Sequence, residues 1–147
     1  MKVLLSWLRE FAPIEGDPYE LADHMSDLGM AVEETRILNP LEGVVVAKVA
    51  ALRPHPKADR IQLVDVEIEN GDPMQVCCGA FNMSVGDLIP FATIGTVMPD
   101  GMEISQREMR GEMSNGMCCS AAELDLGSDH DGIMILPEDL ETGAPLM

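Results

Sequence analysis

The sequence predicts a mainly β protein, in which a small helical segment at the amino terminus is followed by a small closed β-barrel. Three observations lead to this prediction. Residues 1–39 place apolar side chains at helical spacing, together with helix-capping residues. From residue 40 onward the pattern alternates, and short apolar runs are separated by turn-forming residues. A chain of 147 residues, 46% of them hydrophobic, can also bury a core of its own.

Two helices are expected in the first segment. The first covers "SWLREF" (6–11), with Ser6 as its cap. The second follows Asp17 as N-cap, has Pro18 and Glu20 in its first turn, and ends at Gly29. Its apolar residues recur at helical spacing, so it has one face to bury. They are Leu21, Met25 and Leu28, and side chains of the first helix can pack on them, namely Trp7, Leu8 and Phe11.

The segment then leaves through "AVEETRI" (31–37), which we interpret as a strand. About forty residues rarely make an independent core, so residues 1–39 are expected to dock on another part of the protein. The boundary is "NPLEG" (39–43), where Pro and Gly mark the change from helical to alternating periodicity. The second domain is therefore expected to cover residues 40–147.

Beyond the boundary nearly every element is predicted to be a strand. "VVVAKVAAL" (44–52) comes first, and in "IQLVDVEI" (61–68) the apolar parity changes, which indicates a β-bulge. "ENGD" (69–72) is typical of a tight hairpin that returns the chain through "MQVCCGA" (74–80). Four further candidates follow, at 87–97, 102–109, 116–124 and 132–137. Several short bulged strands without a long helix favour a closed barrel, and five such strands suit an oligonucleotide/oligosaccharide-binding (OB) fold.

Charge bears on the possible partners. A net charge of −17 opposes binding to a polyanion, because affinity for phosphates comes mostly from Lys and Arg. Five of the six basic residues of the barrel region nevertheless gather in two clusters, and any RNA contact is expected there. The clusters are Arg53, Lys57 and Arg60, and then Arg107 and Arg110. The alternative is that these side chains only pair with neighbouring carboxylates on a solvated surface.

Catalysis has little support in the sequence. Of the three histidines, only His55 lies in a structured loop, where it is more typical of a turn residue than of a base. The phosphate-binding patterns GxGxxG and GxxxxGK[ST] are missing, and no stretch has membrane-spanning length. The cysteines form two adjacent pairs, at 77–78 and 118–119, which indicate reduced, buried thiols more than a metal site. Base stacking has two aromatic candidates, Phe81 and Phe91, and both can be core residues.

Five motifs in order resemble one known family. They are "HPKADRIQLVDV" (55–66), "VCCGAFN" (76–82), "PDGMEI" (99–104), "MRGEMSNGMCCSAAEL" (109–124) and "GIMILP" (132–137). The family is the tRNA-binding domain shared by the bacterial phenylalanyl-tRNA synthetase beta subunit, by extensions of methionyl-tRNA synthetase and by free-standing tRNA-binding proteins. Its fold is the OB fold. The leader "MKVLLSWLREF" followed by "ELADHMSDLGMAVEE" resembles the start of the phenylalanyl-tRNA synthetase beta chain.

The resemblance implies an N-terminal fragment of a longer, cytoplasmic chain. In such enzymes two alpha and two beta subunits assemble, and the alpha subunit joins phenylalanine to its tRNA with ATP and magnesium. The fragment itself is then expected to be non-catalytic, without a cofactor or metal, and to bind tRNA but neither DNA nor membrane. Two alternatives stay open. The domain can be an assembly module with little RNA affinity, or the chain can be a free-standing tRNA-binding protein.

The match to the family's motifs also implies a set of RNA contacts. In the loop "PHPKAD" (54–59), Pro54, Pro56, His55 and Asp59 are expected to fix the backbone, while the basic residues of the first cluster meet phosphate. His55 is retained as an RNA-contact candidate as well. The complete set of candidates is Arg53, His55, Lys57, Arg60, Asn82, Arg107, Arg110, Ser114, Asn115, Met117 and Ser120. Met117 has a second interpretation as a core residue.

Overall fold

The computed structural model describes residues 3–36, 41–69 and 71–146. The chain divides into two units, Met1–Leu38 and Asn39–Met147. Within the described residues, no helix is both long and apolar enough to cross a membrane.

The first unit contains two short helices, α1 (Leu5–Phe11) and α2 (Pro18–Asp27). Asp17 caps α2 as predicted, because its side chain accepts a hydrogen bond from the backbone N–H of Tyr19 at 2.7 Å. At the other end Gly29 adopts a φ of +87°, the left-handed conformation that closes many helices. Both capping predictions for α2 are therefore confirmed.

Three other predictions for this unit are wrong. Ser6 lies inside α1, whose N-cap is Leu4 without a side-chain hydrogen bond. Trp7 and Phe11 remain 60% and 87% exposed, so the packing expected for these two side chains does not form, whereas Leu8 is half-buried. Residues 31–36 form no strand, and residue 37 lies outside the described residues. A strand needs a partner for its backbone groups, and this unit provides none among its described residues.

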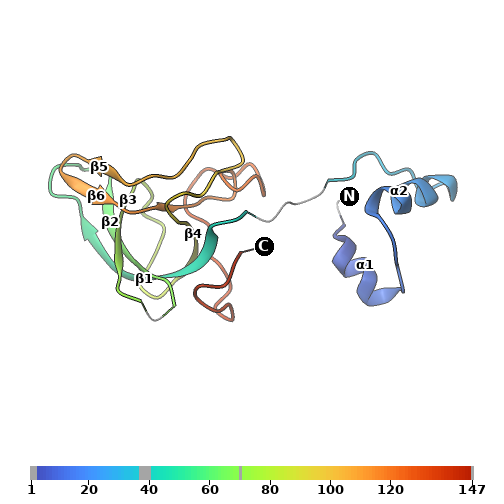
Figure 1. Cartoon of the computed structure of the whole chain (residues 1–147), viewed down its shortest axis with the longest axis horizontal. Helices are drawn as coiled ribbons and strands as arrows, with labels where there is room; N and C mark the ends of the chain where they lie inside the picture. Colours follow the sequence, from blue (N-terminus) through green and yellow to red (C-terminus); the bar gives the residue numbers. More distant parts are fainter. Residues whose placement is uncertain (1–2, 37–40, 70, 147) are drawn as a thin grey trace. The chain divides into compact units, whose positions relative to one another are not determined.

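The second unit confirms the predicted mainly β barrel. A five-stranded sheet has the order β3-β2-β1-β4-β7, and each neighbouring pair is antiparallel. Its strands are β1 (Val44–Pro54), β2 (Gln62–Glu67), β3 (Met74–Cys78), β4 (Leu88–Ala92) and β7 (Met117–Cys118). A separate hairpin consists of β5 (Arg107–Met109) and β6 (Glu112–Ser114). Figure 1 shows this hairpin at the same end of the barrel as the connection between β1 and β2.

The β-bulge lies on β1, and the prediction that placed it in residues 61–68 is wrong. Val49 pairs with Val66 but Ala51 pairs with Asp65, so one extra residue of β1 is accommodated between them. An extra residue bends and twists its strand. β1 can therefore pair with β4 along its first half and with β2 along its second half, and Figure 1 shows it as a long curved strand.

The later strands are much shorter than predicted. Of residues 102–109 only β5 is a strand, of 116–124 only β7, and 132–137 contributes a single bridge between Leu136 and Leu88. Elsewhere in these segments the backbone forms isolated hydrogen bonds and no ladder. For example, the Met134 N–H donates to the Cys119 carbonyl at 3.1 Å. β2 and β3 pair as the predicted hairpin requires, although Asn70 of its turn lies outside the described residues.

The sheet closes on itself between its two edge strands. β3 and β7 run in the same direction as β1, because each is separated from β1 by two antiparallel pairings. They contact each other, and the Asn115 N–H just before β7 donates to the Gln75 carbonyl of β3 at 3.0 Å. We call this junction the seam. The main core inside the barrel is mostly aliphatic and includes Val49, Val64, Val66, Val76, Ile89 and Phe91.

Candidate nucleic-acid interface

His55 joins the connection between β1 and β2 to the β5–β6 hairpin. Its Nδ1 accepts the backbone N–H of Lys57 at 3.0 Å, and its Nε2 lies 2.9 Å from the carbonyl oxygen of Met109. Because Nδ1 is an acceptor, the proton must be on Nε2, which donates to Met109. The ring is only 6% exposed and both nitrogens are engaged. His55 therefore positions the loop, and its ring does not offer a nitrogen to a ligand.

A second hydrogen bond fixes the tip of the hairpin against the same loop. Arg110 has a φ of +53° between β5 and β6, and its guanidinium donates to the Lys57 carbonyl at 3.2 Å. The Lys57 ammonium in turn lies 3.4 Å from the place where a β-carbon on Gly111 would stand. Lys57 and Arg110, which are distant in sequence, are thus neighbours in the structure.

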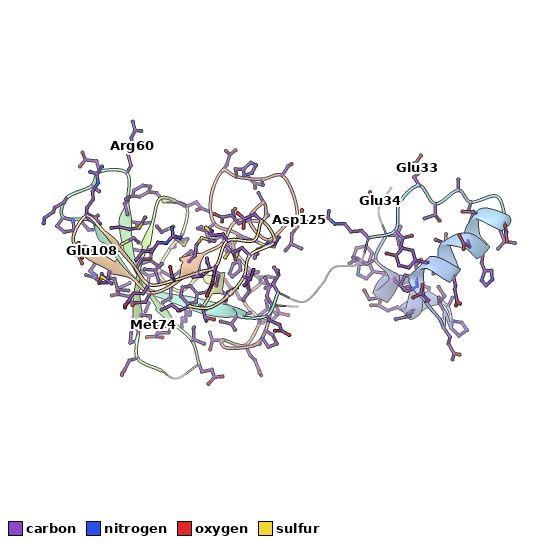
Figure 2. All side chains as sticks on the ribbon, turned by 45° about the horizontal axis from the view of Figure 1, so that its top comes forward. Glu33, Glu34, Arg60, Met74, Glu108 and Asp125 are labelled. Carbon is purple, nitrogen blue, oxygen red and sulfur yellow. The ribbon has the colours of Figure 1, made fainter. Side chains whose placement is uncertain are left out.

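These contacts bring Lys57 and Arg110 together, and we call the exposed cations of the two joined elements the basic surface. Its members are Lys57, Arg60, Arg107 and Arg110, and all four are exposed. Figure 2 shows Arg60 pointing away from the barrel at the tip of its loop. Two carboxylates on the same elements, those of Asp59 and Glu108, are exposed as well. The local excess of positive charge is therefore small, which limits the number of phosphates that this surface can neutralise.

Arg53 is held apart from that group. Its guanidinium forms an ion pair with Asp65 at 2.7 Å and donates to the Gln75 side chain at 3.2 Å. The Arg53 side chain is still 47% exposed, so it can meet a phosphate only in competition with Asp65. For Arg53, the pairing with a carboxylate that the sequence left open is present in the structure.

Ser114 and Asn115, also predicted as RNA contacts, hold the seam. The buried Ser114 hydroxyl accepts the Cys77 N–H at 3.0 Å and donates to the Gly116 carbonyl at 3.1 Å. The side-chain amide of Asn115 donates to the Gln75 carbonyl at 3.1 Å. Both side chains use their polar atoms to join the β6–β7 connection to β3, where no ladder of backbone hydrogen bonds does so.

Replacing Ser114 with Ala therefore tests a structural role against an RNA-contact role. The Cys77 N–H loses its acceptor, which is expected to lower the free energy of unfolding by about 1–3 kcal/mol. The affinity of the folded variant for tRNA should not change. Urea denaturation followed by circular dichroism and a tRNA titration measure the two effects. Ser84→Ala is the matched control, because that serine is exposed and its hydroxyl makes no hydrogen bond to the described residues. A tRNA affinity that falls while stability is unchanged would contradict this assignment.

The remaining predicted contacts are also engaged in the fold. The Asn82 side chain donates to the Ile133 carbonyl at 2.8 Å and accepts the Ile133 N–H at 3.0 Å. Ser120 is buried, and its hydroxyl donates to Glu123 at 2.8 Å. Met117 packs against a second core cluster, in agreement with its interpretation as a core residue.

The two aromatic residues of the barrel have different positions. Phe91 is fully buried, whereas Phe81 is 60% exposed, so the interpretation as a core residue holds for Phe91 and not for Phe81. Its neighbour Ala80 accepts a hydrogen bond from Gln62 at 2.6 Å, which fixes the backbone just before Phe81. A single exposed ring does not form a stacking groove, and contacts to the RNA backbone remain the simpler mode.

Sequence reasoning had no means of finding Gln75, which positions three segments at once. Its side-chain oxygen accepts a hydrogen bond from Arg53, and its backbone carbonyl accepts one from Asn115. Its side-chain amide donates to Glu112 at 3.1 Å and to the Met113 carbonyl at 3.1 Å. No motif marks such a residue, because its role depends on which strands come together. Among the described residues, no group of three or more His, Cys, Asp or Glu side chains could hold a metal ion.

Comparison with known proteins adds three findings. Residues 44–145 match the family model described as "Putative tRNA binding domain". The chain is 45% identical to the phenylalanine–tRNA ligase beta subunit of Nitratidesulfovibrio vulgaris, over 100% of its own length and 18% of that relative. It is also 45% identical to the phenylalanine–tRNA ligase beta subunit of Salinibacter ruber, over 99% of its length and 19% of that relative. The chain thus spans about a fifth of the length of these relatives.

Two solved structures share the fold at low sequence identity. One is a MetRS-related protein from Pyrococcus horikoshii, with a TM-score of 0.53 and 15% identity, covering 71% of this chain and 88% of that one. The other is the C-terminal domain of p43 from Plasmodium vivax, with a TM-score of 0.50 and 18% identity, covering 68% of this chain and 56% of that one. The similarity to these two structures shows a shared fold.

Proposed function

Because this chain belongs to the family of tRNA-binding domains over residues 44–145, we propose that its barrel is an accessory tRNA-binding module of a phenylalanine–tRNA ligase. The similarity to phenylalanine–tRNA ligase beta subunits along the whole chain supports the choice of enzyme. In this proposal the tRNA for phenylalanine is the ligand. The chain works as part of a beta subunit in the cytoplasm, and neither DNA nor a membrane is a partner.

The observation that carries the proposal is the convergence of two basic clusters that are separate in the sequence. His55 and Arg110 join the connection after β1 to the β5–β6 hairpin, so that Lys57 and Arg110 are neighbours and Arg60 and Arg107 are exposed on the same two elements. Lysine and arginine side chains grouped in this way are suited to phosphates of a folded RNA. Two hollows of the surface, one beside Lys48 and one beside Asn82, include no residue of the basic surface, and exposed cations of this kind suit contact with the RNA backbone.

We assign the chemistry of the ligase to another subunit. In the barrel, the one histidine that lies in a structured loop is committed to two hydrogen bonds, and this supports a non-catalytic role. ATP and magnesium then belong to the alpha subunit, in an assembly of two alpha and two beta subunits.

A second role, in assembly, is favoured by the first unit. Its described helices bury no residue, and large apolar side chains remain exposed, with Trp7 at 60%, Phe11 at 87% and Leu28 at 76%. Exposed apolar side chains of this size are typical of an interaction surface. We propose that residues 1–39 dock on the rest of the enzyme and that residues 40–147 form the RNA-binding domain.

A titration of this chain against labelled tRNA for phenylalanine, and against an unrelated tRNA, tests the proposal. We expect saturable binding that weakens with salt, with a slope of roughly 2–4 in log affinity against log salt, because few cations are available. Fluorescence anisotropy at low and at physiological salt measures it. Absence of binding even at low salt would overturn the RNA role and leave the assembly role.

A further inference from the structure

Cys78 and Cys118 are the last residues of the two strands that meet at the seam. Since β3 and β7 run in the same direction and contact each other, both strands end on the same side of the barrel. Both cysteines belong to the same buried cluster and are 8% and 4% exposed. All four cysteines of the chain are free thiols.

The other two thiols face elsewhere. Cys77 alternates to the opposite face of β3, where its Sγ lies 3.9 Å from the Glu112 carbonyl oxygen. Cys119 belongs to a different core cluster, and its Sγ donates to the Met117 carbonyl at 3.5 Å. By contrast, Cys78 and Cys118 lie in the same core cluster, at the ends of two strands that contact each other. The four cysteines therefore include one pair that shares a core cluster across neighbouring strands.

The environment divides the two thiols into a nucleophile and a proton donor. The hydrogen bond from Cys118 lowers the pKa of Cys78 to about 7, and the Ala80 N–H at 3.4 Å lowers it further, against the effects of burial and of Glu123. The same hydrogen bond and burial raise the pKa of Cys118 well above its ordinary value. Near neutral pH a fraction of the molecules therefore holds the Cys78 thiolate beside the Cys118 thiol.

We propose that Cys78 and Cys118 form an oxidisable dithiol, which closes to a disulfide across the seam when the chain meets hydrogen peroxide. The Cys78 thiolate attacks one peroxide oxygen and breaks the O–O bond, which gives a sulfenic acid and a hydroxide that takes a proton to become water. The Cys118 sulfur then attacks the Cys78 sulfur. The S–O bond breaks, and the oxygen leaves as a second water with the Cys118 proton. Two electrons pass from the dithiol to the peroxide, and each peroxide yields two waters.

The position of Cys78 and Cys118 at the seam determines how a disulfide between them would affect stability. The seam is held by the hydrogen bond from the Cys77 N–H to Ser114 and by two hydrogen bonds from Asn115 to the Gln75 carbonyl, whereas the neighbouring strands of the sheet share a ladder. A disulfide would add a covalent link at this weak junction and restrict the unfolded chain between residues 78 and 118. Formation of the disulfide does not depend on RNA binding. Either proposal can therefore fail while the other holds.

The test is oxidation of the reduced chain by one equivalent of hydrogen peroxide under native conditions. The count of titratable thiols in the denatured product is expected to fall from four to two. Trypsin cleaves after Arg60, Arg107 and Arg110, so the two cysteine pairs fall in separate peptides, 61–107 and 111–147. After alkylation of the remaining thiols, mass spectrometry should find these peptides linked through Cys78 and Cys118. The oxidised protein should also unfold at a higher urea concentration than the reduced protein.

Matched variants sharpen the result. Cys77→Ala and Cys119→Ala should keep the linked peptides, while Cys78→Ala and Cys118→Ala should lose them. The peptide map of the unchanged protein does not depend on whether these variants fold. The proposal is overturned if four thiols survive, if Cys78 is oxidised to sulfinic acid without a link, or if Cys77 or Cys119 forms the main link. Oxidation of the urea-unfolded chain is the control for geometry, and mixed linkages are expected there.

Discussion

Replacing Lys57, Arg60, Arg107 and Arg110 together by Gln is expected to weaken binding of this chain to tRNA about 100-fold at low salt. Each side chain that neutralises a phosphate releases counterions from the RNA, and the four replacements remove those contacts without adding negative charge. The salt dependence should also become weaker, so that the slope of log affinity against log salt approaches zero. Fluorescence anisotropy with labelled tRNA measures both quantities, and circular dichroism verifies that the variant is folded.

Lys48 supplies the control for this experiment. It lies on β1 in a groove that it shares with Glu69, Glu138 and Glu141, and not with the basic surface. Lys57→Gln and Lys48→Gln change the net charge equally, so a difference between them reports position. We expect the salt slope to fall by about 1 for Lys57→Gln and to stay unchanged for Lys48→Gln. Equal losses would show that only overall charge matters and would contradict a localised interface.

The largest effect on stability is expected at Gly116, immediately before β7. A β-carbon there would stand 2.8 Å from the backbone oxygen of Ala92 and 2.8 Å from Cε2 of Phe91, whose ring is fully buried and has no room to move. The φ of +145° adds backbone strain for any residue with a side chain. Gly116→Ala should therefore lower the free energy of unfolding by about 3–5 kcal/mol, as strain and overpacking add.

Gly86→Ala separates those two contributions. Gly86 also has a positive φ, +100°, but nothing lies within 4 Å of the place where its β-carbon would stand. Its substitution carries the strain alone and should cost about 1–2 kcal/mol. Urea denaturation should be followed by circular dichroism, because the one tryptophan of the chain, Trp7, lies in the other unit. An equal loss of unfolding free energy at the two glycines would show that the Phe91 ring can move away from the new β-carbon without destabilising the fold.

Much of the fold was predictable from the sequence because it depends on short-range patterns. The cap of α2 at Asp17, the change of periodicity after residue 39 and the strand in residues 44–52 all follow from side chains a few positions apart. Predictions about which segments pack or pair with one another were less successful. α1 does not pack its Trp7 and Phe11, residues 31–36 find no strand to join, and the bulge lies on β1.

For the candidate interface as well, some features were predictable from the sequence and others were not. The identity of the basic residues is a property of the sequence, and so is their grouping in two clusters. Whether the clusters meet was decided by the His55 and Arg110 hydrogen bonds, each of which joins residues more than fifty positions apart. The same long-range contacts give Ser114, Asn115 and Asn82 structural partners, which motif matching had no means of foreseeing.

By itself, then, the sequence determined the fold class, the family resemblance and the pool of cations available to RNA. The tertiary structure alone decided how the barrel closes, which cations become neighbours and which two of the four cysteines share a core cluster across neighbouring strands. The physical reason is that local periodicity and capping depend on neighbours in the chain. Strand register and the closing of a barrel depend on pairings between distant residues, which are settled only when the whole sheet forms.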